Sequence, residues 1–265
     1  MDADLLLAAA LGVPRARLLT LDDVPADVAA RFGELLDQRA ARVPLQHLTG
    51  TAPFRHLELA VGPGVFVPRP ETELIAGWVV DRVAGLTTPT VVDLGAGSGA
   101  IALSVANEHP GARVVAVERD AGAIEWTRHN AATRAAAGDT PVDVLAGDMT
   151  DPGLLTDLDG TVDVVVSNPP YVPDGARLPR EVADHDPPLA LWGGPDGLDV
   201  VRGLLVTAAR LLHPGGWLGI EHADQQGGSL PALVRAHGFT EVHDHPDLAG
   251  RPRYTTARFS GALSR

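Results

Sequence analysis

The sequence contains no cysteine, which excludes disulfide bonds and thiolate metal sites. Aromatic residues make up only 4% of the chain, and no apolar run approaches the length needed to cross a bilayer. The N-terminus also lacks the basic-then-apolar pattern of a secretory signal. We therefore expect a cytoplasmic protein that has no membrane partner.

Positive charge is scarce as well. The chain has 21 Lys and Arg residues against 34 Asp and Glu residues, a formal net charge of −13 at pH 7. Proteins that bind the phosphate backbone of nucleic acids do so with clustered Lys and Arg residues. We therefore expect no direct nucleic-acid binding. The 10 histidines form no recognised ligand motif, and His243-Asp244-His245 falls on an expected edge strand. We therefore predict no metal site.

The first 68 residues differ in pattern from the rest of the chain. Apolar residues recur at helical spacing in Asp4–Leu11 and Val28–Ala41, which predicts two helices. Phe54–Val67 alternates in polarity around Gly62-Pro63-Gly64, which predicts two short strands joined by a turn. We interpret residues 1–68 as a small helical domain with a β-hairpin connector, and residues 69–265 as a second domain.

From about Pro70 onward, strands and helices alternate, which predicts an α/β domain with a parallel sheet and helices on both faces. The expected strands are Val91–Leu94, Val114–Val117, Val142–Leu145, Val162–Val166 and Trp217–Ile220, and the expected helices are Ala100–Glu108, Ala121–Ala137 and Leu198–Leu212. The last segments, Glu241–His245 and Tyr254–Phe259, have no helix between them. We expect them to form an antiparallel pair at the edge of the sheet.

A glycine-rich turn, Asp93-Leu94-Gly95-Ala96-Gly97-Ser98-Gly99, lies where the first strand gives way to its helix. Glycines there permit positive φ and let a ligand approach the backbone closely. Glu118 ends the second strand 23 positions after Gly95, where it suits both hydroxyls of a ribose. Asp148 ends the third strand and could accept a hydrogen bond from the exocyclic amine of adenine. The turn and its two acids predict an adenosine-bearing cofactor, either a dinucleotide or S-adenosylmethionine.

The tetrad Asn168-Pro169-Pro170-Tyr171 follows the fourth strand, which we expect beside the first. Two prolines stop the strand and remove two backbone donors. The Asn168 side chain and nearby carbonyls are then left to accept hydrogen bonds from a planar NH₂ group, and Tyr171 can stack on that group. The simpler interpretation is a strand followed by a turn that proline stabilises. A hydride-transfer enzyme needs no such cradle of acceptors, whereas a methyltransferase that acts on an amide or amino nitrogen does.

With these motifs in place, the chain resembles the N5-glutamine methyltransferases of peptide chain release factors. The shared segments are Pro44–Gly50, Val67–Glu73, Asp93–Ala100, Asn168–Tyr171, Pro188–Leu191, Gly193–Gly197 and Asp247–Arg251. Asn-Pro-Pro-Tyr also occurs in adenine-N6 DNA methyltransferases, whereas Arg69-Pro70-Glu71-Thr72-Glu73 is far more specific. It separates the family from similar enzymes that methylate a glutamine of a ribosomal protein. The N-terminus departs from the pattern, since family members usually begin with more helix before the segment matching Asp2–Leu11.

The resemblance implies a Rossmann-like class I methyltransferase fold with a mostly parallel seven-stranded sheet, and an N-terminal helical domain that docks the substrate. It implies that S-adenosylmethionine is the cofactor and that the Gly-Gly-Gln loop of a release factor is the substrate. Cofactor contacts would come from Gly95, Ala96, Gly97, Ser98, Gly99, Glu118, Asp148, Met149 and Asn168. Asn168, Pro169, Pro170 and Tyr171 would hold the substrate glutamine, with Arg69 and Glu73 near the mouth of the site.

The expected chemistry assigns catalysis to two oxygen acceptors, the Asn168 side-chain oxygen and the Pro169 carbonyl. Each would accept one N–H of the glutamine amide, so that the nitrogen lone pair points at the methyl group. We also expect the long Pro- and Gly-rich loop Val172–Gly197 to hold the substrate peptide. The competing interpretations are a DNA or RNA amino-methyltransferase, an enzyme for a ribosomal-protein glutamine, a non-catalytic cofactor-binding protein and an oxidoreductase.

Overall fold

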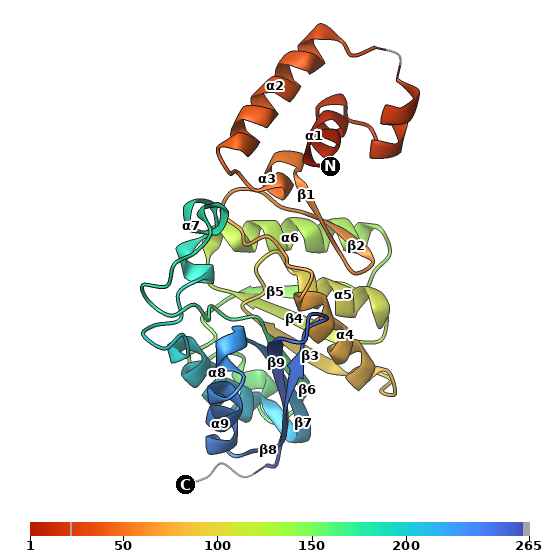
Figure 1. The fold of residues 1–265 in the computed structure, drawn as a ribbon. Coiled ribbons are helices and arrows are strands. Elements are labelled where there is room, and N and C mark those ends of the chain that lie inside the picture. The colour runs from red at the N-terminus through yellow and green to blue at the C-terminus, as the bar shows by residue number, and fades with distance from the viewer. Residues whose placement is uncertain (22, 262–265) are drawn as a thin grey trace.

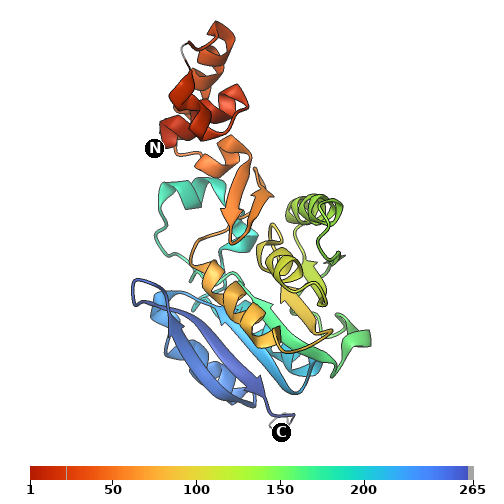
Figure 2. The same cartoon turned by 90° about the vertical axis from the view of Figure 1, so that its right-hand side faces the viewer.

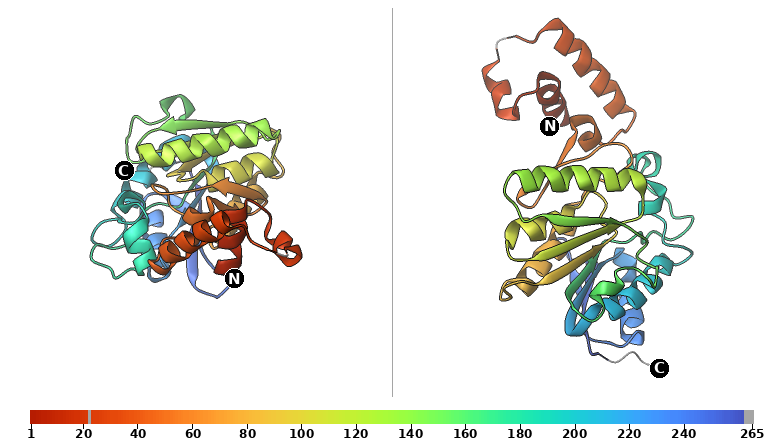
Figure 3. Two further views of the ribbon diagram at one scale, coloured as in Figure 1. Left: turned by 90° about the horizontal axis from the view of Figure 1, so that it is seen from above. Right: turned by 180° about the vertical axis from the view of Figure 1, so that it is seen from behind.

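The computed structural model describes residues 1–21 and 23–261. A group of helices from the first fifty residues stands at one end of a larger body, in which a sheet is covered by helices (Figure 1). A view turned by 90° shows a small hairpin between the two parts (Figure 2). Seen from behind, the first helices lie beyond the same end of the sheet as α7, Arg180–His185 (Figure 3).

Residues 1–21 and 23–50 of the N-terminal part form three α-helices and one short 3-10 helix. Helix α1 spans Asp2–Leu11, η1 Arg15–Thr20, α2 Ala26–Ala40 and α3 Leu45–Thr49. The two helices predicted from apolar periodicity are confirmed as α1 and α2. Each begins two residues earlier than predicted, because polar first-turn residues such as Asp2 and Asp27 carry no apolar signal.

The hairpin connector consists of β1, Thr51–Phe54, and β2, Leu57–Ala60, which pair antiparallel. Its turn lies at Arg55–His56, so the prediction that Gly62-Pro63-Gly64 joins the two strands is wrong. Those residues form a separate turn after β2. Arg55 adopts a positive φ of 50° there. Its guanidinium donates to both carboxylate oxygens of Glu108, at 2.5 and 2.7 Å. This ion pair stabilises Arg55 in the turn, in a segment that contains no glycine to adopt the positive φ.

Seven strands form the main sheet in the order β5-β4-β3-β6-β7-β9-β8. Their bounds are β3 Thr90–Leu94, β4 Arg113–Glu118, β5 Val142–Ala146, β6 Val162–Ser167, β7 Leu212–Glu221, β8 Phe239–Pro246 and β9 Pro252–Phe259. Neighbours from β5 to β7 pair in parallel, whereas β9 runs antiparallel to both β7 and β8. The predicted mostly parallel seven-stranded sheet and its antiparallel edge pair are confirmed.

Helices cover both faces of this sheet, as expected for strands that are apolar on both sides. One face carries α4 (Thr72–Val83), α5 (Ala100–Glu108) and α6 (Ala121–Ala136), and the other carries α8 (Asp199–Leu211) and α9 (Ser229–Ala236). Successive residues of β3 alternate between the faces, since Val91 packs with α4 and α5 while Val92 packs with α8. The helices predicted at 100–108, 121–137 and 198–212 are confirmed as α5, α6 and α8.

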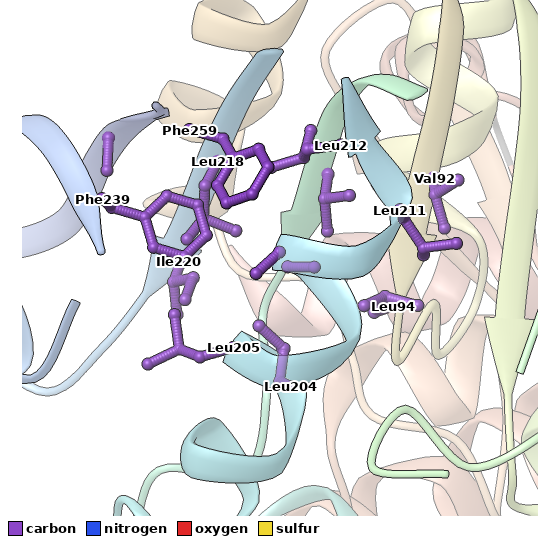
Figure 4. Packing of buried hydrophobic residues seen from close by; sticks show 14 of the residues in the cluster. Val92, Leu94, Leu204, Leu205, Leu211, Leu212, Leu218, Ile220, Phe239 and Phe259 are labelled. Carbon is purple, nitrogen blue, oxygen red and sulfur yellow. The ribbon is translucent and has the colours of Figure 1, made fainter. Parts of the chain in front are cut away.

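In the core under α8, leucines of that helix pack against leucine, valine, isoleucine and phenylalanine side chains of the central and edge strands (Figure 4). Leu204 and Leu205 of α8 are fully buried, and Leu218 and Ile220 of β7 are at most 1% exposed.

Among residues 1–21 and 23–261, no helix is both long and apolar enough to cross a membrane. Nor does any group of three or more His, Asp or Glu residues in that part of the chain have an arrangement suited to a metal ion.

We predict that Leu204→Ala lowers the free energy of unfolding by about 2–5 kcal/mol, because it leaves a cavity between α8 and β7. Val206→Ala is the matched control on the same helix, since Val206 is 54% exposed. That control is expected to change stability by no more than about 0.5 kcal/mol. Urea unfolding followed by circular dichroism measures both, and equal losses in the two variants would contradict this description of the core.

Candidate active site

The glycine-rich turn and the Asn-Pro-Pro-Tyr tetrad meet at one edge of the sheet. Strands β3 and β6 pair in parallel with Asp93 opposite Val166, so the segments that follow them emerge side by side. The Ser167 hydroxyl at the end of β6 donates to the Leu94 carbonyl at the end of β3. A cavity of about 280 Å³ lies against these strand ends.

Most of the predicted site residues line this one cavity. They are Arg69, Gly95, Ala96, Gly97, Ser98, Glu118, Asp148, Met149, Asn168, Pro170 and Tyr171. Gly99, Pro169 and Glu73 are not among the described residues that line it. Glu73 lies in the first turn of α4, where its backbone carbonyl accepts a hydrogen bond from Arg55. The residues predicted for the cofactor and for the substrate therefore share a single space.

The turn after β3 can approach a ligand closely because its glycines adopt left-handed backbone conformations. Gly95 has a φ of 82°. A Cβ atom at Gly95 would also lie only 2.6 Å from the terminal methyl of Met149, which itself lines the cavity. Gly95 therefore leaves room for the Met149 side chain against the turn. Gly95 and Met149 both line the cavity, so a bound ligand would contact the turn and the Met149 side chain together.

Two carboxylates predicted to bind the cofactor flank the turn. Glu118 accepts the Gly97 N–H at 2.9 Å through one oxygen, and the Arg119 and Asp120 N–H groups at 2.7 and 2.9 Å through the other. Burial alone would raise the pKa of Asp148, but hydrogen bonds from Thr150 and Arg119 hold it below its usual value. Both acids line the cavity, where their oxygens suit a ribose and an amino-purine.

Asp93 places a third carboxyl beneath the turn. Its side chain is buried, and one oxygen accepts the Ala102 N–H at 3.1 Å while the other has no partner in the described part of the chain. Burial raises the pKa of Asp93 to about 7, and the nearby negative charge of Glu118 adds to the shift. The hydrogen bond from Ala102 opposes both effects. Asp93 is not among the described residues that line the cavity, and a cation bound nearby would favour its ionised form.

Asn168 is half-buried, and its amide is held from one side. The amide nitrogen donates to the Thr72 hydroxyl at 3.2 Å, where Thr72 is the first residue of α4. The side-chain oxygen is consequently the end of the amide that points away from Thr72. Pro169 and Pro170 are buried and end the β6 ladder. An acceptor oxygen is thus presented at the carboxyl end of a buried strand.

Tyr171 also lines the cavity, and its hydroxyl lies near the buried carboxyl of Glu221. Burial raises the pKa of Tyr171 well above its usual value, and the neighbouring Glu221 adds to the shift. Glu221 ends β7 and is 1% exposed. Burial raises the pKa of Glu221 to about 7, although hydrogen bonds from Thr72 and Tyr171 and the charge of Arg253 favour the ionised form. The Tyr171 hydroxyl therefore lies close to the Glu221 carboxyl.

The loop from Val172 to Gly197 packs onto the back of the tetrad. The Val172 N–H donates to the Leu191 carbonyl at 2.8 Å, and the Gly193 N–H donates to the Val172 carbonyl at 2.9 Å. Gly197 has a φ of 75°, and a Cβ there would collide with the Tyr171 carbonyl. The Gln226 amide donates to that same carbonyl at 3.1 Å. The tetrad backbone is thus fixed from residues far along the chain.

An ion pair lies beside the cavity, where Arg69 is one of the lining residues. Arg69 donates to Asp186 at 2.6 Å and lies over the Phe66 ring at 4.8 Å from its centroid. Burial raises the pKa of Asp186, while Arg69 partly offsets this effect. A second bond, from Arg39 of α2 to Glu181 of α7 at 2.7 Å, joins the N-terminal helices to the same loop. The sequence analysis identified Arg69 as a site residue but did not identify its partner, Asp186.

From the sequence, Thr72 was expected near the site only as part of the segment Arg69–Glu73, without a role of its own, and Glu221 was not identified. Thr72 stands within the Arg-Pro-Glu-Thr-Glu segment that was noted, so a signal for it existed. Glu221 ends an apolar strand in the same way as Glu118, and that position was the signal that could have found it. The predicted third strand ends earlier than expected, at Ala146, and Asp148 follows it.

Protein families and individual proteins that resemble this chain in sequence are named as methyltransferases. Residues 58–183 match the family model described as "Methyltransferase small domain", and residues 1–50 match "PrmC N-terminal domain". A protein of Mycolicibacterium smegmatis named release factor glutamine methyltransferase is 50% identical, over 97% of this chain and 89% of that protein. A Streptomyces coelicolor protein with the same name is 51% identical, over 97% of this chain and 90% of that protein.

Solved structures agree on the fold. A methyltransferase from Pyrococcus furiosus superposes with a TM-score of 0.56 at 21% identity, covering 85% of this chain and 100% of that one. At this level of identity, the likeness indicates the Rossmann-like methyltransferase architecture alone.

We predict that Gly95→Ala weakens S-adenosylmethionine binding at least about tenfold, because the methyl group displaces Met149 and strains the turn. Gly12→Ala is the matched control, since Gly12 has a φ of 67° and open space around its Cβ position. It adds similar backbone strain at the end of α1, far along the chain from the turn. Titration calorimetry compares the two variants, and unchanged affinity in Gly95→Ala would contradict the assignment of the turn.

Proposed function

This chain belongs to the release factor glutamine methyltransferase family, and from that membership we propose its reaction and substrate. The proposed reaction transfers a methyl group from S-adenosylmethionine to the side-chain amide nitrogen, N5, of a glutamine. That glutamine is the one in the Gly-Gly-Gln motif of peptide chain release factors. The observation that carries the proposal is the single cavity shared by the glycine-rich turn and Asn168.

The cofactor half of the proposal rests on the residues around the turn. Gly95, Ala96, Gly97, Ser98 and Gly99 would wrap the cofactor, Glu118 would accept from its ribose, and Asp148 with Met149 would hold its adenine. When bound, S-adenosylmethionine supplies a methyl group on a positively charged sulfur. The carboxylates of Glu118 and Asp148 line the site and suit this charge, and the positive sulfur would favour ionisation of the nearby Asp93.

The substrate half of the proposal rests on the tetrad. An amide nitrogen is a poor nucleophile, because its lone pair is delocalised into the carbonyl. The Asn168 oxygen and the Pro169 carbonyl would each accept one N–H of the glutamine, which turns the lone pair toward the methyl carbon. Pro170 and Tyr171 would form the wall of the glutamine site. Fixed orientation of this kind accounts for about 7–11 kcal/mol of barrier in the best intramolecular reactions.

The partner would approach over the end of the sheet where the N-terminal helices stand. We assign residues 1–68 to docking of the release factor and residues 69–265 to catalysis. Arg69, Glu73 and the Val172–Gly197 loop would lie along the incoming peptide. The Arg39–Glu181 bond supports this arrangement, since it joins the proposed docking helices to that loop. A cytoplasmic location, where release factors act, belongs to the same proposal.

The direct test incubates the purified chain with S-adenosylmethionine and a release factor and locates any added methyl group by peptide mass spectrometry. We expect a gain of one methyl group on the glutamine of Gly-Gly-Gln. A release factor with that glutamine changed to alanine is the substrate control. An unmodified peptide, in an assay where a known enzyme of the family works, would refute the proposal. Label appearing in added DNA or RNA instead would favour an amino-methyltransferase of nucleic acids.

We predict that Asn168→Ala lowers kcat at least about 100-fold, because the amide loses one of its two orienting acceptors. Cofactor binding should remain measurable, since the glycine turn and Glu118 are unchanged. Asn107→Ala is the matched control, because Asn107 lies on α5 and bonds to Asp139 outside the cavity. Steady-state methylation of the release factor measures both variants. Normal turnover by Asn168→Ala would overturn the assigned role.

A further inference from the structure

Two residues outside the tetrad hold the side chain of Asn168. Thr72 is only 4% exposed, and its hydroxyl accepts the Asn168 amide N–H at 3.2 Å. The same hydroxyl lies near the carboxyl of Glu221, which is 1% exposed and has one oxygen without a hydrogen-bond partner among the described residues. Asn168, Thr72 and Glu221 therefore form a short chain of polar groups that leads from the cavity to the end of β7.

The direction of this chain follows from the hydrogen-bonding capacity of each group. A threonine hydroxyl has one hydrogen to donate and lone pairs to accept with, whereas an ionised carboxylate only accepts. When the Thr72 hydrogen points to Glu221, its oxygen can only accept from Asn168. That arrangement directs the nitrogen end of the Asn168 amide to Thr72 and leaves the oxygen end toward the cavity.

We propose that Thr72 and Glu221 are positioning residues that fix the Asn168 amide with its oxygen toward the substrate. This inference rests on the proposed function, since it concerns how the glutamine NH₂ group is held. An Asn168 amide turned by 180° would present N–H donors to the donors of the glutamine. Such a pair cannot form a hydrogen bond, and the methyl acceptor would lose its alignment.

The ionisation of Glu221 decides whether the arrangement holds. Groups from several elements face this carboxyl: Thr72 and Glu71 at the start of α4, Tyr171 of the tetrad and Arg253 of β9. An ionised Glu221 takes the Thr72 hydrogen. A protonated Glu221 can instead donate to Thr72, which frees the threonine hydrogen to bond the Asn168 oxygen. Activity should therefore rise with pH as Glu221 loses its proton, at about pH 7.

The first test compares Thr72→Val, which removes the hydroxyl at nearly constant shape, with Thr72→Ser, which keeps it. We expect Thr72→Val to lower kcat for release-factor methylation by about 10- to 100-fold, with the KM for release factor and the Kd for S-adenosylmethionine changed by less than about threefold. Thr72→Ser should keep kcat within about threefold of the unmodified chain. Thr207→Val is the matched control, since Thr207 is fully buried on α8 and does not line the cavity.

The outcomes of this test separate the inference from the proposed function. If the unmodified chain fails to methylate any release factor, the proposed function fails. If that chain is active and Thr72→Val retains at least about a third of its kcat, the positioning role is wrong. Equal losses in Thr72→Val and Thr72→Ser would also refute it, because packing and not the hydroxyl would then be responsible.

The second test uses Glu221→Gln and stands even if Thr72→Val fails to fold. Glutamine cannot ionise, so this variant should have a lower kcat than the unmodified chain at pH 8. It should also lose the part of the rise in kcat between about pH 6 and pH 8 that the ionisation of Glu221 causes. Any contribution of the buried Asp93 to the pH profile would persist in the variant. A kcat profile that keeps the full rise of the unmodified chain would overturn the role of Glu221.

Discussion

Backbone hydrogen bonds between β3 and β6 bring the carboxyl ends of these strands to the same edge of the sheet. This parallel pairing places the glycine turn, which follows β3, beside the tetrad, which follows β6. The apolar strands form because helices bury both of their faces, and α8 and α4 supply the cover on either side. The cavity and the chemistry assigned to it depend on this pairing, because Gly95 follows β3, Asn168 follows β6, and both residues line the cavity.

The loops that leave the sheet are held by contacts that lie far apart in sequence. Gln226 bonds the Tyr171 carbonyl, Thr72 bonds Asn168, and Arg69 pairs with the buried Asp186. Each contact fixes a group at the edge of the cavity before a ligand enters. Preorganised acceptors do not have to reorient as the reaction proceeds, and this is the usual source of catalytic advantage in a polar site.

Local sequence patterns predicted the parallel part of the sheet, its antiparallel edge and helices α5, α6 and α8, because apolar runs and helical periodicity report burial directly. The glycine turn and the tetrad were found for a similar reason, since glycine and proline impose backbone conformations of their own. Other features came from tertiary contacts. The hairpin turn at Arg55 is held by Glu108, and Thr72 reaches Asn168 across 96 positions. No pattern within a short window reports such partners.

The central claim is that the Asn168 oxygen receives a glutamine N–H next to the methyl donor. A crystal structure of the chain with S-adenosylhomocysteine and a Gly-Gly-Gln peptide tests this claim most directly. The account predicts the glutamine nitrogen within about 3.2 Å of both the Asn168 oxygen and the Pro169 carbonyl. It also predicts the cofactor sulfur on the side of the glycine turn. A glutamine amide bound away from Asn168, or a cofactor bound outside this cavity, would contradict it.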